Sequence, residues 1–277
     1  MEGLKNRAVA LIVCTALVLV GWFGGSAIQE MGGRLITADA AGVKANETAM
    51  QVGTEEVTMG EYLYWVTAVC DSMYQYYGVT DWSVKMTEDM TLEEYVKTEA
   101  DYYAKQYAGV RQLAAEKGVS LTEEQQEMLD GMHDYWCQMY GEEAVYEYML
   151  RVSGLTEDML VENNISPFLY NNLCDQLLAE GGELEPTEEN VKAFLEKYEL
   201  GELGEEERMS AYLDPEHGAI PAYMDEYIAG LEVTMSPAHD ALDLNVYYPA
   251  LTEAREQLPK PEVEPAGGTD DLGSAQE

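Results

Sequence analysis

The stretch MQVGTEEVTMGEYLYWV, residues 50–66, decides the fold class. Apolar and polar residues alternate until Gly53, and the alternation resumes at Val57. Alternation on both sides of a glycine-containing turn is typical of a β-hairpin, in which successive side chains point to opposite faces. We therefore predict two short strands, at 49–52 and 56–58.

A helix is predicted to follow the hairpin without a break. Thr58 and Glu61 have the spacing of a capping box, in which each side chain bonds the other residue's backbone N–H, and Gly78 is a typical helix stop. The helix is thus predicted over 59–77. Its apolar residues recur at helical spacing and form a stripe that we expect to be buried: Tyr62, Trp65, Val66, Val69, Met73, Tyr76 and Tyr77.

Two further capping boxes predict the next helices. Thr91 with Glu94 begins a long helix that Gly118 ends, and Thr122 with Gln125 begins a third helix. The apolar stripe of the long helix includes Leu92, Tyr95, Val96, Tyr103, Tyr107, Val110, Leu113 and Ala114. The apolar positions of the third helix are Met128, Met132, Trp136, Met139 and Tyr140.

Glycines and a proline divide the next part of the chain. Gly141, Gly154 and Gly181 bound two more helices. The second of these contains Pro167, which predicts a break or a kink because proline cannot donate the helical hydrogen bond. A helix at 187–198 follows.

The C-terminal part is predicted to contain a helix, a short strand at 231–235 and a last helix capped by Asp243. An isolated two-stranded ribbon is marginal in water and leaves open edges. We therefore predict that 231–235 adds a strand to the hairpin and that the last helix covers the sheet. Residues 259–277 are rich in proline, glycine and acids, and we expect them to be disordered.

The predicted fold is mainly α, a multi-helix domain with a small β-hairpin completed by a C-terminal strand. We divide the chain into an N-terminal anchor and linker (1–45), a helical domain (46–200), a C-terminal segment that returns to pack on that domain (201–258) and an acidic tail (259–277).

A transmembrane anchor is predicted at residues 8–28, AVALIVCTALVLVGWFGGSAI, which carry no charged side chain. A helix needs about 20 apolar residues to span a bilayer. Lys5 and Arg7 precede the segment and predict that the bulk of the chain is extracytoplasmic. We expect the anchor to stay uncleaved, which places the protein at the cell membrane. The alternative is cleavage near Ala40, after a small-residue site, and secretion.

The net charge of −38, from 53 acidic and 15 basic residues, bounds the partners. We expect no nucleic-acid partner, because a chain with this much negative charge repels phosphate backbones. The same field attracts basic polypeptides.

No catalytic or cofactor motif is present: the sequence contains no HExxH, CxxC or GxSxG, and no Gly-rich phosphate loop. We expect no cofactor, no metal and no readable catalytic residue. His133 lies near Asp130 and Asp134 in the sequence, and we interpret the three as a solvated polar helix face.

The cysteines past the anchor do not form a disulfide framework, because they are three and widely spaced. We expect Cys70 and Cys174 to be small buried hydrophobic residues, with one optional pair among Cys70, Cys137 and Cys174 left open.

The order of these elements resembles the SurA/PrsA-type foldases. The strand–glycine turn–strand–helix at 50–66 is similar to the start of that family. The segments VRQLAAEKGVSLTEEQQEMLD (110–130), GLTEDMLVENNISPFLYNNLCDQLL (154–178) and PTEENVKAFLEKYEL (186–200) resemble its next helices, in order. The resemblance covers residues 46–200 and implies a chaperone core that the C-terminal segment completes.

The chain departs from that family where a parvulin-like prolyl isomerase domain would begin, near residue 200. His217 lies in a Pro-Gly loop and His239 follows Ser-Pro, and neither has the strand context that the resemblance requires. No catalytic residue of the family is therefore carried over.

The chain has 20 Tyr, 4 Trp and 15 Met, more than the predicted stripes use. Most of these residues are expected in the core. The surplus suits promiscuous binding of unfolded chain, because Met is flexible and Tyr combines an apolar face with a polar tip. The candidates for polypeptide binding are Tyr64, Tyr74, Tyr76, Tyr77, Trp82, Trp136, Met139 and Tyr140.

The sequence thus favours a membrane-anchored, extracytoplasmic, non-catalytic chaperone that transiently binds newly exported, unfolded polypeptides. Two alternatives stay open. One is a prolyl isomerase with an unrecognised site, which needs a twisted parvulin-like sheet after residue 200. The other is a scaffold that holds one defined partner at the membrane.

Overall fold

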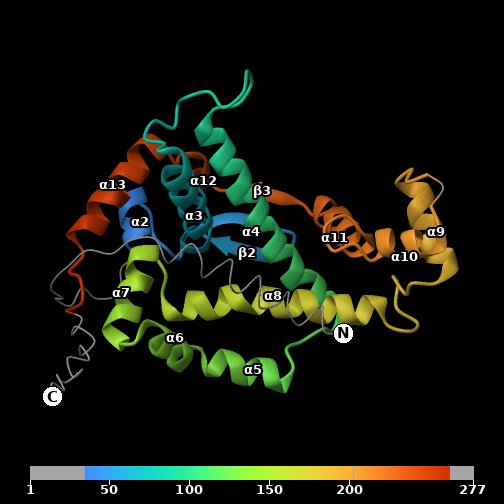
Figure 1. Ribbon diagram of the computed structural model, residues 1–277. Helices are drawn as coiled ribbons and strands as arrows, with labels where there is room; N and C mark the ends of the chain where they lie inside the picture. The colour runs from blue at the N-terminus through green and yellow to red at the C-terminus, as the bar shows by residue number, and fades with distance from the viewer. Residues whose placement is uncertain (1–34, 202, 263–277) are drawn as a thin grey trace, which may run out of the picture.

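The computed structural model describes residues 35–201 and 203–262. These residues form a mainly helical fold with one small antiparallel sheet, which confirms the predicted fold class at that level (Figure 1). The predicted anchor at 8–28 lies outside the described residues, as does the tail from 263 onward. Among the described helices, none has the length and apolar character needed to cross a bilayer.

The sheet joins the two ends of the described chain. Strands β1 (Thr48–Val52) and β2 (Glu55–Thr58) form the hairpin, and β3 (Val233–Met235) pairs antiparallel with the other edge of β1. Met50 lies opposite Val57 on one side and Met235 on the other. The predicted pairing between the hairpin and residues 231–235 is confirmed.

Helices α3 (Met59–Tyr77) and α4 (Leu92–Lys117) pack against each other and begin at the predicted threonine caps. The capping box at Thr91 is complete. At Thr58 it is half formed: the hydroxyl accepts from the Glu61 N–H, but the Glu61 carboxylate bonds Arg111 Nη1 at 3.0 Å instead. The Arg111 guanidinium on α4 thus competes successfully for the carboxylate that would have closed the box.

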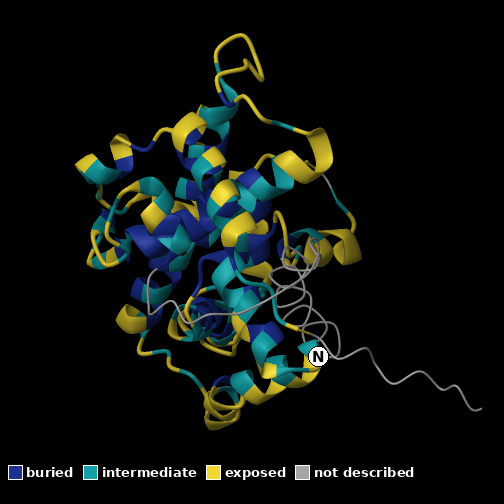
Figure 2. Ribbon diagram, turned by 90° about the vertical axis from the view of Figure 1, so that its left-hand side faces the viewer, coloured by how far each residue is buried: buried dark blue, intermediate teal, exposed yellow. Residues whose placement is uncertain are grey.

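The main core lies between the sheet, α3, the first half of α4, α2 (Ile36–Ala41) and α13 (Leu244–Gln257). Buried positions gather there in the centre of the molecule (Figure 2). On α4 the close approach to α3 is made by small residues that the predicted stripe did not include, namely Ala100, Ala104 and Ala108, all fully buried. Tyr103, which the stripe did include, is partly exposed because those alanines take the inward face.

The predicted buried stripe of α3 is wrong at its C-terminal end. Tyr62, Trp65 and Val66 are buried, but Tyr76 and Tyr77 are 74% and 76% exposed. The last turn of α3 extends beyond the layer of elements that covers the rest of the helix, so helical spacing alone did not reveal the change.

The middle of the chain forms helices α5 (Glu123–Asp130), α6 (Met132–Tyr140), α7 (Glu143–Ser153) and α8 (Glu157–Leu178). The single third helix predicted after Thr122 is therefore wrong, because the structure divides it at Gly131 into α5 and α6.

Helix α8 continues through Pro167, so the predicted break is also wrong. Leu160 and Phe168, on either side of the proline, are both buried. The apolar contacts of both halves outweigh the one hydrogen bond that proline removes.

The part after α8 contains more helix than predicted. Helix α9 (Glu188–Lys197) was expected, whereas α10 (Glu205–Tyr212) lies in a stretch for which no helix was predicted. The Glu207 carboxylate accepts the Gly204 N–H at 2.9 Å and caps α10. Tyr212 then packs edge-on against Phe194 in a small core of its own.

Helix α11 (Ala219–Ala229) returns to α4, and α12 (Pro237–Asp240) leads from β3 toward α13. Helix α13 begins at Asp243, whose carboxylate accepts the Asn245 N–H at 2.9 Å, as predicted. In the structure α13 packs along α2 (Figure 1), so the prediction that the last helix covers the sheet is wrong. The small-residue site at 38–40 lies inside α2, where Thr37 and Ala38 are buried, so cleavage near Ala40 would remove part of the core.

Candidate functional site

Two groups of exposed large apolar side chains stand out on the described surface, at opposite ends of the molecule. The first, the α3-end surface, comprises the last turn of α3 and the loop that follows it. Its members are Tyr74, Tyr76, Tyr77, Val84 and Met86. This surface lies at the top in Figure 1, where α3 leads into the loop that joins it to α4.

The loop of the α3-end surface is held by Trp82. The Trp82 side chain is fully buried and meets the Tyr248 ring edge-on at a centroid distance of 5.2 Å. Its backbone N–H donates to Asn245 Oδ1 at 2.9 Å. Trp82 is thus an anchor that fixes the loop to α13. Contrary to our prediction, its buried side chain is not available to bind a polypeptide.

Tyr64 is also removed from the candidate set. Its side chain is buried and packs edge-on against Trp65 at 4.8 Å. Burial, with a smaller effect of Tyr107, raises the pKa of the Tyr64 phenol. Tyr64, which we counted among the surplus aromatic residues available for binding, therefore belongs to the core.

An aromatic band that sequence reasoning missed lies on α4. Tyr103 stacks on Trp65 at 5.2 Å, and Tyr102 meets Tyr103 edge-on at 5.6 Å. Both tyrosines are exposed to solvent on one side. The spacing of the three buried alanines of α4 could have shown that these adjacent tyrosines point away from the main helix contact.

The second group, the α6 surface, comprises Met128 of α5 and four residues of α6. The four are the exposed Tyr135 and Met139 and the half-buried Trp136 and Tyr140, which also pack against the main core. No residue of α6 is buried, although most of its side chains are apolar. Met139 is 62% exposed, and Trp136 and Tyr140 stack on each other at 5.8 Å with their faces half covered. Of the predicted candidates, Trp136, Met139 and Tyr140 lie together here, whereas Tyr74, Tyr76 and Tyr77 lie on the α3-end surface.

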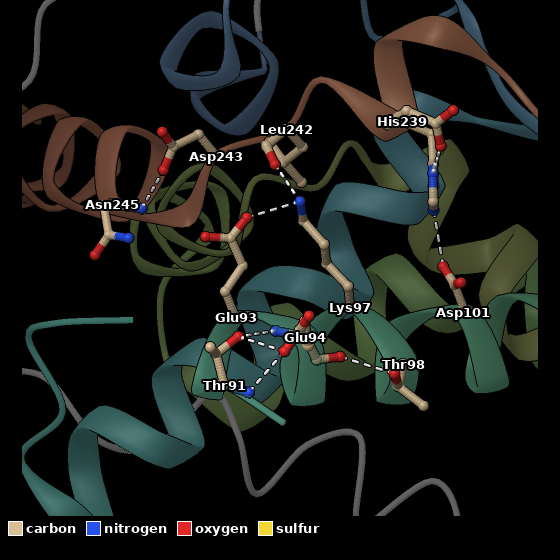
Figure 3. Close-up of polar contacts among 11 residues, drawn as sticks. Thr91, Glu93, Glu94, Lys97, Thr98, Asp101, His239, Leu242, Asp243 and Asn245 are labelled. Carbon is tan, nitrogen blue, oxygen red and sulfur yellow. Dashed lines mark hydrogen bonds and ion pairs between the residues drawn. The ribbon is translucent and has the colours of Figure 1, made fainter. Parts of the chain in front are cut away.

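His239 is part of a buried polar cluster that the sequence did not reveal. Its Nε2 lies 2.9 Å from Asp101 of α4 and its Nδ1 lies 3.0 Å from Asp240, with the Tyr62 ring 4.6 Å away. Figure 3 shows the imidazole reaching from the C-terminal segment to Asp101, while the Lys97 ammonium, one turn earlier on α4, donates to the Leu242 carbonyl. Two carboxylates, one at each ring nitrogen, require a doubly protonated imidazolium.

The charge of His239 follows from competing effects. Burial lowers the pKa of His239, but the hydrogen bonds and charges of Asp101 and Asp240 outweigh burial and raise the pKa above its ordinary value. With only 7% of its surface exposed, this imidazolium fastens the segment between β3 and α13 to α4. We interpret the cluster as structural.

The described cysteines are all free. Cys70 and Cys174 are buried, as predicted, and Cys137 is half exposed on α6. His217 is exposed on the loop before α11, close to Asp214. Over residues 35–201 and 203–262, no group of three or more His, Cys, Asp or Glu side chains could hold a metal ion.

Comparison with known proteins gives no match: neither a family model, nor a curated protein, nor a solved structure is similar to this chain.

Proposed function

We propose that the protein is a membrane-anchored, extracytoplasmic chaperone that transiently binds unfolded, newly exported polypeptides through the α6 surface and the α3-end surface. The observation that carries the proposal is α6 itself. No residue of this helix is fully buried: Met132, Trp136 and Tyr140 are only partly covered by the main core, and Tyr135 and Met139 are exposed. So much Tyr, Trp and Met without one fully buried residue is unusual in a folded domain. Grouped exposed apolar side chains of this kind mark interaction sites.

The chemistry of both surfaces suits a partner without a fixed sequence. Tyrosine offers a broad apolar face with a polar tip, and methionine adapts its shape to different side chains. An aromatic side chain brings about 150–250 Å² of area, so covering one that is mostly exposed yields about 2–4 kcal/mol. When several such contacts form together, the entropy lost on association and on ordering of the partner offsets much of their combined free energy. The result is affinity suited to rapid exchange.

Charge and backbone geometry define the partner further. The net charge of −38 favours segments that carry basic residues beside apolar ones. The sheet offers little for backbone pairing, because β1 is its central strand and the free edges belong to the short strands β2 and β3. Binding would therefore rest on side chains rather than on strand addition.

The resemblance to SurA/PrsA-type foldases agrees with this proposal, since it implies a chaperone core completed by the C-terminal segment. The isomerase alternative required a twisted sheet after residue 200. Among the described residues after that position, β3 is the single strand. The scaffold alternative predicts one defined partner and is separated from a chaperone by the breadth of clients bound.

The test is suppression of aggregation by the full-length chain, held in a non-ionic detergent, against an aggregation-prone exported protein during refolding. Two double variants remove one surface each: Tyr76→Ser with Tyr77→Ser, and Tyr135→Ser with Met139→Ser. Val246→Ser is the control, since Val246 is 64% exposed and lies on α13, outside both surfaces.

The proposal expects suppression near stoichiometric ratios, weakened several-fold by at least one double variant and unchanged by the control. Suppression that equals that of an unrelated protein of similar acidity would overturn it. Binding of a single partner, with no effect on several other clients, would replace it with the scaffold role.

A further inference from the structure

The first half of α4 leaves one of its faces uncovered. Farther along the helix, Gly109 lies against Ile228, so α11 covers this face there. Tyr102 stands seven residues before Gly109, on the same face, and is 51% exposed. We call the uncovered part the α4 tyrosine face. Its members are Tyr95, Glu99, Tyr102 and Tyr103.

The core beneath the α4 tyrosine face holds its rings in place. Tyr103 stacks on Trp65 of α3 at a centroid distance of 5.2 Å and an interplanar angle of 21°, and Trp65 is itself only 8% exposed. Tyr102 meets Tyr103 edge-on at 5.6 Å, and Tyr95 packs partly against the main core. The face is therefore a fixed aromatic platform, and a ligand that binds to it would lose little free energy in ordering these side chains.

Two carboxylates border the rings. Glu99 stands three or four residues from each tyrosine of the face, so it is their neighbour on the helix surface. Asp225 of α11 accepts from Gln106 Nε2 at 3.2 Å, one turn beyond Tyr102. Over residues 35–201 and 203–262 neither carboxylate forms an ion pair. Both negative charges therefore lack a cationic partner within this part of the chain.

The two carboxylates act on the rings beside them. Burial, and then chiefly the charge of Asp225, raise the pKa of the Tyr102 phenol. Burial, and then chiefly the charge of Glu99, raise the pKa of the Tyr95 phenol. No cationic side chain of the described residues counters either shift. The surroundings of the platform are thus negative.

A rigid aromatic face beside unpaired carboxylates favours a planar cation. The face of an aromatic ring carries partial negative charge and attracts a cation that lies within about 6 Å of the ring centroid. Among side chains arginine fits best, because its guanidinium is planar, stacks on rings and bonds a carboxylate through two parallel N–H groups. Lysine carries the same charge, but its compact ammonium is more strongly hydrated and does not stack.

We propose that the α4 tyrosine face binds arginine side chains of extended polypeptide segments, with the guanidinium stacked on Tyr102 beside the carboxylates of Glu99 and Asp225. The face adjoins the α3-end surface, because α3 packs against α4 and Tyr77 is among the neighbours of Tyr95. One extended segment can thus place an arginine here and apolar residues there. The inference rests on the proposed function in taking the partner to be a polypeptide, and it adds the residue that this partner presents.

The test measures the binding of short, fluorescently labelled Gly/Ser peptides to the full-length chain in a non-ionic detergent, by fluorescence anisotropy. One peptide carries several arginines, and its two counterparts carry lysines or glutamines at the same positions. We expect the arginine peptide to bind about 2–5-fold more tightly than the lysine peptide for each stacked guanidinium. The glutamine peptide should bind least.

Two variants remove the two components of the site. Tyr102→Leu keeps an apolar side chain but removes the ring, so it should bring the affinities for the arginine and lysine peptides together. Asp225→Asn should weaken the binding of both peptides more than Glu124→Gln, which neutralises an exposed carboxylate of α5. The matched control for the ring is Tyr135→Leu, at a tyrosine of α6 that is 52% exposed. Neither control should change the arginine-to-lysine ratio.

Equal affinities for the arginine and lysine peptides in the unchanged chain would overturn the proposal, because net charge alone would then account for binding. A ratio that survives Tyr102→Leu, or that falls equally in Tyr135→Leu, would also overturn it by placing the arginine elsewhere. Aggregation suppression by the same preparations separates this proposal from the proposed function. Suppression without arginine preference refutes the arginine site alone, and arginine preference without suppression refutes the chaperone role alone.

Discussion

The substitution Arg255→Met tests how the C-terminal helix is held to the rest of the fold. Arg255 of α13 makes two parallel bonds to Asp71 of α3, at 2.7 and 2.8 Å, and its Nε donates to the Val152 carbonyl at 2.8 Å. Tyr248 donates to the same carboxylate at 2.9 Å. One guanidinium thus joins α13, α3 and α7. Methionine keeps most of the side-chain volume, so the substitution removes the charge and its donors with little change in packing.

The expected loss follows from what the substitution leaves behind. Removing one partner of a buried ion pair costs about 3–5 kcal/mol, because the other charge stays buried without compensation. The Arg255 side chain is 10% exposed, but that of Asp71 is 27% exposed and recovers part of its hydration, so we take the lower end. The free energy of unfolding should fall by about 3 kcal/mol. With a urea m-value of about 3 kcal/mol/M for a chain of this size, the unfolding midpoint should fall by about 1 M.

Urea unfolding, followed by circular dichroism, measures this shift. Arg208→Ala is the control, since Arg208 is an exposed arginine on α10 and its loss should change stability by less than about 0.5 kcal/mol. The pair Arg255→Met with Asp71→Asn should be less destabilised than the sum of the single variants, because the two side chains interact directly. A midpoint shift for Arg255→Met no larger than that of the control, or full additivity in the double variant, would refute the reasoning.

Three further predictions concern the same fold. Because the pKa of His239 is raised in the folded state, its contribution to stability is complete below the unfolded pKa of about 6.5 and is lost as pH rises through the folded pKa. Unfolding midpoints measured between pH 5 and 9 should therefore decline as the pH rises. His239→Gln or Asp101→Asn should remove this decline. A chain that begins at residue 41 loses the buried half of α2, so it should melt at a clearly lower temperature than one that begins at residue 35, and equal melting temperatures would contradict the packing of α2. Gly109→Ala places a Cβ 2.5 Å from Ile228 of α11, and this overpacking should cost about 1–3 kcal/mol of stability. The better helix propensity of alanine offsets about 1 kcal/mol of that cost. In an Ile228→Ala background the clash is absent, so chemical unfolding should show that Gly109→Ala is stabilising there.

Local signals in the sequence predicted the backbone well where they were complete. The predicted threonine caps at 58, 91 and 122 all begin helices in the structure, since a side-chain acceptor at that place satisfies a backbone donor wherever the helix is packed. The long-range pairing of β3 was also predictable, because the hairpin left an edge that had to be covered. Helix α10 was missed because its cap is a glycine without a side-chain acceptor, and Glu207 supplies the bond instead.

The candidate site was less predictable, because periodicity marks a helix face without showing what covers it. Tyr76 and Tyr62 belong to one stripe of α3, yet one is exposed and the other is fully buried, according to whether α13 and the sheet reach that turn. Trp82 lies in an irregular loop and was placed at the surface for that reason, although it is a core residue. The approach of Glu157 to His133 depends on how α8 packs beside α6, which no local pattern records.

The order in which the sheet is assembled along the chain has a consequence during synthesis. About 180 residues separate β1 from β3, and ribosomes add about 5–20 residues per second. The hairpin therefore emerges about 10–40 s before the strand that completes it, and α2 waits equally long for α13. Throughout that interval the outer edge of β1 and the apolar faces of α2 and α3 lack their native cover, so the first part of the nascent chain cannot reach its final state. Folding of the first part of the chain is thus delayed until the C-terminal segment has been made, and for tens of seconds the growing chain itself exposes the kind of surface that a chaperone binds.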